Sequence, residues 1–329
     1  MNVSWFRQRG ARVAGTLVMA PCLLGLGLAT VRAAADAVKV FAIPTATSGP
    51  VYITTGPDNH LWFTEFNVSK IGTVTTAGRV KEFTLPTANS QPQDIVTGPD
   101  KNLWFTEGTG NKIGRITTAG VITEYPVPTA SSYPLGITVG PGNSLWFAEA
   151  DGNKIGRITT SGSISEFPLP TAGSGPFGIT TGPDRNLWFA ESTGNKIGRM
   201  TATGVVTEFP VRTAKSFPAT IRTGPDNNLW FTERSAGRIG RVTTEGVVTE
   251  FPIPTANSQP NGIAKGPDNN LWFAESAGNR IGRITVKGVI TEYPVPTSGS
   301  TPLGITTGPN KEVWFTEHHG NTIGEITTK

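Results

Sequence analysis

The chain has 329 residues, of which 36% are hydrophobic and 16% charged, with 40 glycines, 26 prolines and a single cysteine. The formal charge of +4 comes from the first 35 residues, which hold four arginines and no acidic residue, so the remainder balances 24 basic against 24 acidic side chains. A balanced charge argues against the basic face that nucleic acids and anionic membranes favour, and we expect neither as a partner.

Residues 1–35 have the features of a signal peptide. A basic stretch precedes a mostly apolar run over residues 13–28, and Ala33 and Ala35 supply the small residues of a cleavage site. The run is shorter than the roughly 20 apolar residues of a spanning helix. We therefore predict export to the periplasm or the medium, with a mature chain that begins near Asp36 and holds no cysteine. A retained membrane anchor is the alternative.

Residues 36–329 consist of a repeat. The motif Trp-Phe-Thr/Ala-Glu recurs every 42 residues. Its tryptophans are Trp62, Trp104, Trp146, Trp188, Trp230, Trp272 and Trp314. Seven copies of 42 residues account for the whole length of 36–329, so we predict a single domain made of repeats alone.

Each copy holds four short β-prone segments separated by Gly, Pro and Asn/Asp turns. In the third copy they are residues 135–139, 145–149, 154–160 and 164–169. Four strands in a unit of about 40–45 residues form the blade of a β-propeller. No segment has the 3.6-residue apolar period of a helix. The sequence thus predicts an all-β protein, a seven-bladed β-propeller with four antiparallel strands per blade.

The last copy stops after its third strand, and the missing strand is found at the other end of the chain. The residues from Val38 to Thr45, VKVFAIPT, align with the fourth-strand motif VVTEFPIPT. We expect this N-terminal strand to complete the last blade, which closes the ring and removes two exposed sheet edges.

Residues present in every copy are most simply scaffold residues, so functional residues should lie where the copies differ. The tryptophans are therefore expected to pack between blades, and the Gly-Pro-Asp-x-Asn segments to form β-turns. His60 replaces an asparagine of one such turn and is expected at the surface.

A glutamate ends the second strand of every copy. These residues are Glu65, Glu107, Glu149, Glu191, Glu233, Glu275 and Glu317. The structural interpretation is hydrogen bonding to the adjacent loop, or pairing with the Lys or Arg that follows five residues later in six copies. The functional interpretation is a cation bound near the axis, for which Glu317 and Glu275 are the candidate metal ligands.

The strand order places the loops before each first strand and after each second strand on one face. Around the conserved proline on this face the copies differ, with aromatic, amide and acidic side chains. The candidate ligand-binding residues are Tyr52, Gln93, Asp94, Tyr133, Phe177, Phe217 and Asn261. Such a lining is typical of a site for a small organic molecule, a peptide or a glycan, and we expect such a ligand on a monomeric protein.

His318 and His319 follow Glu317 in the last copy, where they depart from the repeat. They are the candidate catalytic residues. The alternative, which we expect, is a solvent-exposed pair, because loops of this kind are exposed and adjacent side chains tend to diverge.

The repeat LWFTE…NKIGRITT.G.ITEYPVPT…PLGIT resembles that of the virginiamycin B lyase family over all seven copies. The resemblance implies a seven-bladed propeller that linearises a cyclic depsipeptide, a streptogramin B, by elimination with Mg²⁺. Such chemistry needs a base for the proton next to the acyl group and a Lewis acid for the developing enolate. It also implies a histidine after the conserved proline in the last two copies, a carboxylate before that proline in the last copy, and a carboxylate in the loop after its second strand.

This chain departs from that pattern. The two histidine positions hold Asn261 and Leu303, and the carboxylate before the proline corresponds to Thr301. The other carboxylate corresponds to Glu317 or His318, depending on the register.

We therefore expect a ligand-binding propeller without the family's histidine-based elimination. Two alternatives remain. One is a Mg²⁺-dependent streptogramin B lyase, a carbon–oxygen lyase, with His318 or His319 as a relocated base. The other is a structural or protein-interaction propeller. Magnesium follows from the resemblance alone.

Overall fold

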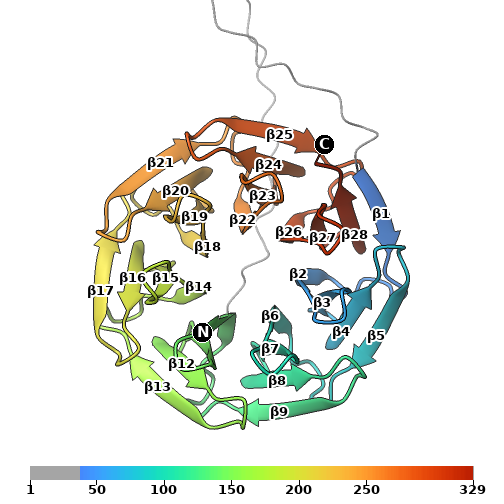
Figure 1. The fold of residues 1–329 in the computed structure, drawn as a ribbon, viewed down its shortest axis with the longest axis horizontal. Helices are drawn as coiled ribbons and strands as arrows, with labels where there is room; N and C mark the ends of the chain where they lie inside the picture. Colours follow the sequence, from blue (N-terminus) through green and yellow to red (C-terminus); the bar gives the residue numbers. More distant parts are fainter. Residues whose placement is uncertain (1–37, 329) are drawn as a thin grey trace, which may run out of the picture. The chain divides into compact units, whose positions relative to one another are not determined.

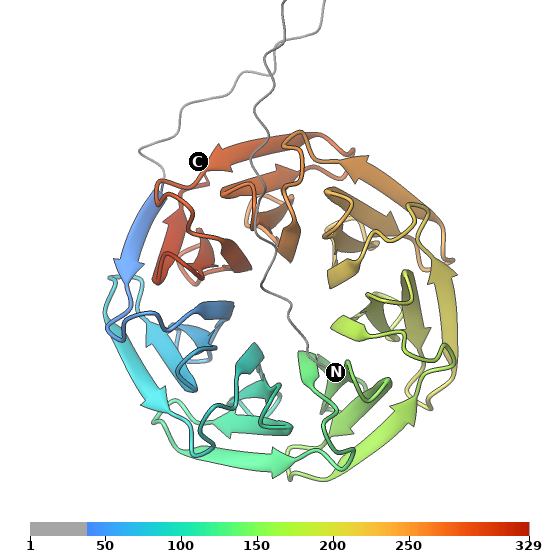
Figure 2. The ribbon, with the colours of Figure 1, turned by 180° about the vertical axis from the view of Figure 1, so that it is seen from behind.

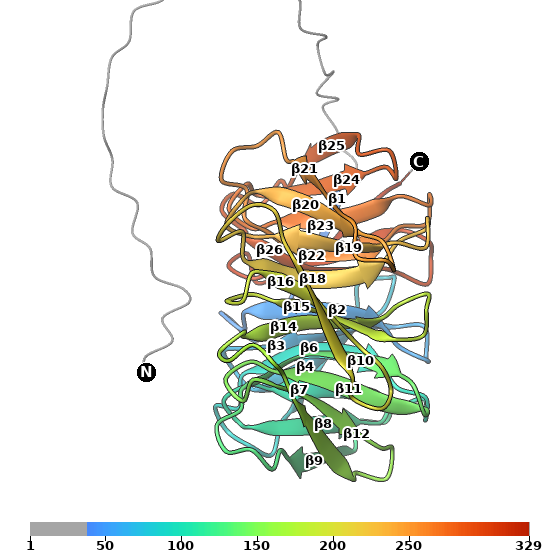
Figure 3. The same ribbon diagram turned by 90° about the vertical axis from the view of Figure 1, so that its left-hand side faces the viewer.

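The computed structural model describes residues 38–328, which form seven four-stranded antiparallel sheets around one axis (Figure 1). The expected seven-bladed β-propeller is confirmed. The same ring is seen from behind in Figure 2, and Figure 3 shows its sheets from the side. Within the described residues, no helix has the length and apolar character needed to cross a membrane. The predicted signal peptide lies outside the described residues.

The strands of each blade follow in chain order from the innermost to the outermost. Blades 1 and 2 comprise β2 (Pro50–Thr55), β3 (Leu61–Glu65), β4 (Lys70–Val74), β5 (Val80–Thr84), β6 (Pro92–Thr97), β7 (Leu103–Glu107), β8 (Lys112–Ile116) and β9 (Ile122–Pro126). Blades 3 and 4 comprise β10 (Pro134–Gly140), β11 (Ser144–Glu149), β12 (Lys154–Ile158), β13 (Ile164–Pro168), β14 (Pro176–Thr181), β15 (Leu187–Glu191), β16 (Lys196–Met200) and β17 (Val206–Pro210). Blades 5 and 6 comprise β18 (Pro218–Thr223), β19 (Leu229–Glu233), β20 (Arg238–Val242), β21 (Val248–Pro252), β22 (Pro260–Lys265), β23 (Leu271–Glu275), β24 (Arg280–Ile284) and β25 (Ile290–Pro294). Blade 7 comprises β26 (Pro302–Thr307), β27 (Val313–Glu317), β28 (Thr322–Ile326) and, as its outermost strand, β1 (Val38–Ala42).

The N-terminal strand completes the last blade, as expected. β1 pairs antiparallel with β28, and Val40 lies opposite Gly324. The Lys39 ammonium contacts the Glu325 carboxylate at 3.1 Å. Figure 1 shows β1 in line with the outermost strands of the other blades, so the ring closes through a sheet built from both ends of the chain.

The tryptophans pack between blades, which confirms their scaffold role. Trp188 of β15 belongs to one buried apolar cluster with Leu229 and Phe231 of the next blade. Its ring stacks on Phe209 with centroids 5.5 Å apart, and its indole N–H donates to Asp184 at 3.0 Å. The acidic residue of the Gly-Pro-Asp turn therefore anchors a core tryptophan. In blade 1 the same turn carries His60, whose side chain is 40% exposed beside Asp58.

Each innermost strand carries a β-bulge directly after its first proline. In β2 the pairing register shifts between Pro50 and Ile53, and the six other innermost strands shift at the same place. A bulge of this kind bends the strand and redirects the side chains that follow it. The side chains after each proline therefore do not follow the regular alternation between the two faces of the sheet.

Candidate functional site

The loops that enter the innermost strands and the loops that leave the second strands lie on one face. In blade 1 the main-chain N–H of Phe66 donates to the oxygen of Gly49 at 3.1 Å, and that of Asn67 donates to Ser48 at 3.0 Å. Corresponding bonds join the two loops in the other blades. The centre of this face, where the innermost strands begin, is called the channel mouth; its prolines are Pro50, Pro92, Pro134, Pro176, Pro218, Pro260 and Pro302.

Two of the candidate ligand residues meet across the axis. The Tyr52 hydroxyl of blade 1 donates to Asn261 Oδ1 of blade 6 at 3.1 Å, and it lies 3.2 Å from the Thr220 hydroxyl of blade 5. Burial raises the pKa of Tyr52 to about 12, with the Asp94 charge adding to the rise. The phenol therefore stays protonated at neutral pH and serves as a donor. This network crosses the channel between blades that are not neighbours.

Asp94 lies in the same part of the channel, and three groups hold its carboxylate. Its carboxylate lies 3.8 Å from the Arg222 guanidinium and accepts from the N–H groups of Ile95 and Ile137 at 2.9 and 3.2 Å. Burial raises the pKa of Asp94, whereas Arg222 and the two amides oppose the rise. The ion pair joins blades 2 and 5.

Close packing explains why most blades have glycine at the Tyr52 position. A Cβ added to Gly136 would lie 2.5 Å from the Phe177 carbonyl oxygen of the next blade. The corresponding distances at Gly178, Gly262 and Gly304 are 2.6, 2.4 and 2.5 Å, again to a neighbouring carbonyl oxygen. Tyr52, Asp94 and Thr220 are therefore departures from the sevenfold packing, and these departures create the polar network in the channel.

The candidate residues Gln93 and Tyr133 form a second polar group at the mouth. Gln93 Nε2 donates to the Tyr133 hydroxyl at 3.2 Å, and that hydroxyl donates to Gln91 Oε1 at 3.4 Å. Burial raises the pKa of Tyr133, with the charge of Asp151 adding to the rise. Phe177 is half-buried and packs against the apolar cluster that contains Tyr52.

The residue before each of these prolines has a left-handed backbone conformation. Its φ lies between 50° and 61° in all seven blades, and blades 1 and 4 use glycine there. Tyr133 and Phe217 nevertheless adopt φ of 52° and 60°. Bulky side chains reach this conformation at a cost, and such strain tends to gather at functional sites. The two aromatic rings are thus held at the mouth at some expense in stability.

His318 is buried, with 7% exposure, and the expected solvent-exposed pair is wrong for this residue. Its ring uses the space left by Gly49, where a Cβ would come within 2.9 Å of His318 Cε1, and it lies edge-on to Phe66 with centroids 6.4 Å apart. Burial lowers the pKa of His318 to about 4, with His319 adding to the effect, so the ring is neutral at pH 7. The exposed His319 turns to Thr301, with 2.8 Å between Nδ1 and the hydroxyl oxygen.

The seven conserved glutamates are fully buried inside their own blades. In blade 2, burial raises the pKa of Glu107 to about 7, and the nearby Glu124 adds to the rise. Lys112, the basic residue five positions after Glu107, pairs instead with the outer glutamate: its Nζ lies 2.7 Å from the Glu124 carboxylate. Glu124 also accepts from the hydroxyl of Thr87, on the loop from the previous blade, at 2.6 Å. The expected pairing with the following base is therefore made by the outer glutamate in this blade.

The residues of the last blade do not fit the magnesium site that the resemblance implies. Burial raises the pKa of Glu317, and Thr322 and Val40 replace the base and the outer glutamate of the other blades. Thr301 supplies a hydroxyl where the resemblance implies a carboxylate. Across residues 38–328, no group of three or more His, Cys, Asp or Glu side chains is arranged to hold a metal. Magnesium favours an octahedron of oxygen ligands that includes carboxylates.

The other candidate metal ligand, Glu275, has a comparable environment in blade 6. Burial raises its pKa to about 8, and the neighbouring Glu292 adds to the rise. Its side chain is fully buried.

Two arginines of blade 5 were not anticipated. Arg222 stands where the other blades have Thr, Val or Ala, and Arg234 stands where they have Phe, Gly, Ala, Ser or His. Arg222 reaches Asp94. Arg234 is close enough to Tyr52 for its charge to oppose the rise in the pKa of Tyr52. Comparison of the copies at these two positions would have identified both residues.

Comparison with known proteins agrees with the repeat motifs. The model of the virginiamycin B lyase family matches residues 31–174 and 143–329. The structure of selenomethionine-substituted virginiamycin B lyase from Staphylococcus aureus is 41% identical, with a TM-score of 0.85, and the match covers 89% of this chain and 99% of that one. A streptogramin B lyase structure is 40% identical, with a TM-score of 0.85 and coverage of 88% and 97%.

A third structure is that of a catalytically inactive histidine-to-alanine variant of the Staphylococcus aureus enzyme with quinupristin. It is 40% identical, with a TM-score of 0.85 and coverage of 89% of this chain and 99% of that one. No curated protein matches the chain. On the family match and these identities, the chain belongs to the virginiamycin B lyase family.

Proposed function

We propose that the protein is a ligand-binding propeller that does not carry out the elimination of its lyase relatives. The observation that carries the proposal is which residues occupy the two positions that the resemblance assigns to histidine, and what those residues contact. Asn261 accepts the hydrogen bond of Tyr52 at 3.1 Å, and Leu303 is 3% exposed within an apolar cluster. Neither side chain can take up a proton, so a base is missing where the family chemistry needs one.

The channel mouth has the composition of a binding site for an organic molecule. Aromatic rings from Tyr133, Phe177 and Phe217 stand near amide and hydroxyl groups such as Gln93 and Tyr52. Apolar surface supplies affinity in such sites, and a few fixed polar groups set the orientation. A small organic molecule, a peptide or a glycan fits this description.

The test is turnover of quinupristin, the streptogramin present in the relative's structure. The purified protein is incubated with quinupristin and Mg²⁺, and the products are analysed by mass spectrometry. We expect the cyclic compound to remain intact. Linear product from the wild type would overturn the proposal.

A second candidate function rests on His318. The imidazole is neutral at pH 7 and lies beside Gly49 at the mouth, so it has the protonation state of a general base. In this case the chain is a lyase with a relocated base. Turnover that disappears in His318→Ala but persists in His319→Ala would identify it.

We also propose that the protein is exported. The basic, apolar and small-residue segments of residues 1–35 support a cleaved signal peptide. Cell fractionation followed by N-terminal sequencing tests this, with Asp36 as the expected first residue of the periplasmic or secreted form. Full-length protein in the membrane fraction would contradict it.

A further inference from the structure

On the face that carries the channel mouth, blade 5 differs from the other blades at one position. It is the residue directly after each conserved glutamate, in the loop that leaves the second strand. The seven residues are Phe66, Gly108, Ala150, Ser192, Arg234, Ser276 and His318. Arg234 alone among them is permanently charged at neutral pH, because His318 is held neutral by burial.

The serines at this position show where its side chain points. Ser192 Oγ donates to the carbonyl of Pro218 at 2.6 Å, and Ser276 Oγ donates to that of Pro302 at 3.0 Å. Each proline begins the innermost strand of the next blade. The Arg234 side chain therefore leaves its loop toward the start of β22, at the channel mouth.

Arg234 has no counter-ion in the described part of the chain. No carboxylate among residues 38–328 lies within 4.0 Å of its guanidinium, whereas Arg222 has Asp94 at 3.8 Å. Burial lowers the pKa of Arg234, yet a guanidinium remains charged at neutral pH. A partly buried charge is costly until it is paired, so this part of the mouth favours an anion.

Aromatic surface lies next to this charge. The main-chain N–H of Arg234 donates to the Phe217 oxygen at 3.1 Å, which places the residue with the strained φ of 60° beside the arginine. Tyr52 is close enough to Arg234 to influence its pKa. The mouth thus combines one cation with apolar rings and hydroxyl groups.

We propose that Arg234 binds the acidic group of an organic anion whose aromatic or aliphatic body lies against the rings of the channel mouth. This inference rests on the proposed binding function and narrows its ligand class to a carboxylate, sulfonate or phosphate carried on an apolar body. The guanidinium suits such groups because it can donate two parallel hydrogen bonds to their oxygens.

Two fluorescent probes of the same shape test this inference. Anilinonaphthalene sulfonate carries an acidic group on an aromatic body, and N-phenylnaphthylamine is the same body without that group. We expect the wild type to bind the sulfonate more tightly, by about tenfold or more. A rising salt concentration should weaken the binding of the sulfonate and leave the affinity for the neutral probe unchanged.

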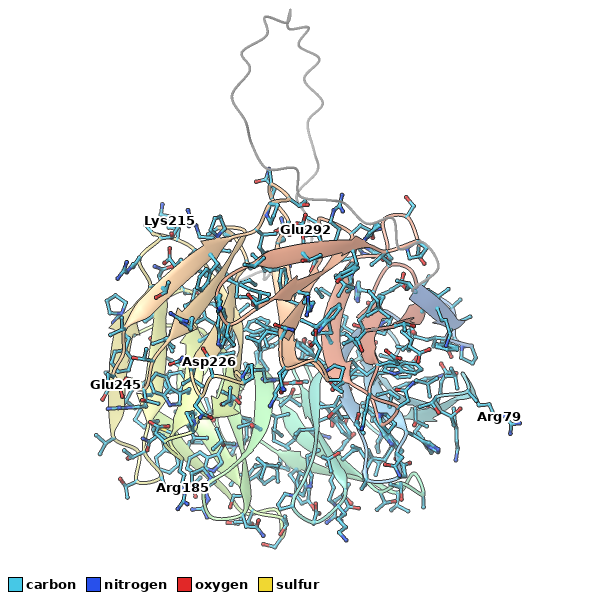
Figure 4. All side chains as sticks on the ribbon, turned by 45° about the horizontal axis from the view of Figure 1, so that its top comes forward. Arg79, Arg185, Lys215, Asp226, Glu245 and Glu292 are labelled. Atoms are coloured by element: carbon cyan, nitrogen blue, oxygen red, sulfur yellow. The ribbon has the colours of Figure 1, made fainter. Side chains whose placement is uncertain are left out.

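The variants locate the site. Arg234→Gln should reduce sulfonate affinity to that of the neutral probe, without a change for the neutral probe. Arg79→Gln is the matched control, because Arg79 is exposed on a turn at the periphery of the ring (Figure 4). Phe217→Gly should weaken the binding of both probes, and this result would place both of them at the channel mouth.

The outcomes separate the inference from the function on which it rests. Equal affinity of the wild type for both probes, or sulfonate binding that survives Arg234→Gln, would overturn the anion site and leave the binding function standing. If neither probe binds the wild type, the binding function fails with it. Arg234→Lys guards against misfolding of the first variant, since it keeps the charge and should retain the salt dependence at reduced affinity.

Discussion

The side-chain amide of Asn321 donates a hydrogen bond to the main-chain oxygen of Thr45, at 3.0 Å and across 276 positions of sequence. The Oδ1 of Asn321 accepts from the N–H and hydroxyl of Ser48 at 2.7 and 2.9 Å. One side chain therefore ties the last blade to the segment that leads from β1 into β2. Asn111 makes the same contacts within a continuous stretch of chain.

We expect Asn321→Ala to lower the free energy of unfolding by about 3 kcal/mol, because several partly buried hydrogen bonds are lost and alanine disfavours the φ of 55°. Urea denaturation measures the change. Asn111→Ala is the control, with a similar loss of stability. Limited proteolysis should release the β1 segment faster only in the Asn321 variant, and equal release from both would contradict a role in ring closure.

Gly237→Asn should stabilise the protein by about 1 kcal/mol. Gly237 takes the place of this asparagine in blade 5 with φ of 61°, a conformation that Asn321 already adopts. The Ser258 hydroxyl is buried there without a hydrogen-bond partner in the described residues, and a Cβ at Gly237 would make an ordinary contact with it at 3.7 Å. Thermal and urea unfolding report the gain. An unchanged midpoint would show that the asparagine does not form these bonds in blade 5.

The protein should lose stability as the pH rises from about 4.5 to about 8. Burial, with a neighbouring glutamate, raises the pKa of Glu65 to about 8 and that of Glu107 to about 7. A pKa above the unfolded value contributes stability that is complete below about pH 4.5 and is lost as the pH passes the folded value. Glu107→Gln should flatten this decline in melting temperature, whereas an equally steep decline in the variant would exclude Glu107 as a source.

Below about pH 4.5 the outer glutamates act in the opposite direction. The side-chain bonds from Lys112 and Thr87 outweigh burial and lower the pKa of Glu124. The stability that Glu124 contributes is fully present above its pKa in the unfolded chain, and it is lost as the pH falls through its pKa in the folded protein. The melting temperature should therefore pass through a maximum near about pH 4.5, and Glu124→Gln should reduce the slope on the acid side of that maximum.

Restoring the family residues should restore elimination. A variant with Asn261→His, Leu303→His and Thr301→Glu carries both histidines and the carboxylate before the proline that the resemblance implies, and we expect linear product from quinupristin with Mg²⁺. A positioned base contributes about 10²–10⁴ in rate, so Leu303→His alone without the metal-side carboxylate should fall far below the triple variant. Mass spectrometry detects the product, and a chelator should abolish it. A folded but inactive triple variant would show that further residues are missing.

The fold was predictable because a repeat of constant length reports the same strand pattern seven times. The site was predictable where a copy departs from the repeat in the innermost strand, as for Tyr52, Asp94 and Asn261. The burial of His318 was not, because it depends on the space above Gly49, in a loop 269 positions away in the sequence. Arg234 was missed because the position after the conserved glutamate was considered only in the last copy, at His318.

The network of Tyr52 also bears on how the ring holds together. In an open array of repeats each unit touches only its neighbours, and stability adds up along the array. Here a side chain of blade 1 bonds to blades 5 and 6, and neither adjoins it. A local opening on one side of the axis therefore removes contacts on the other, and we expect the seven repeats to unfold together as one cooperative unit.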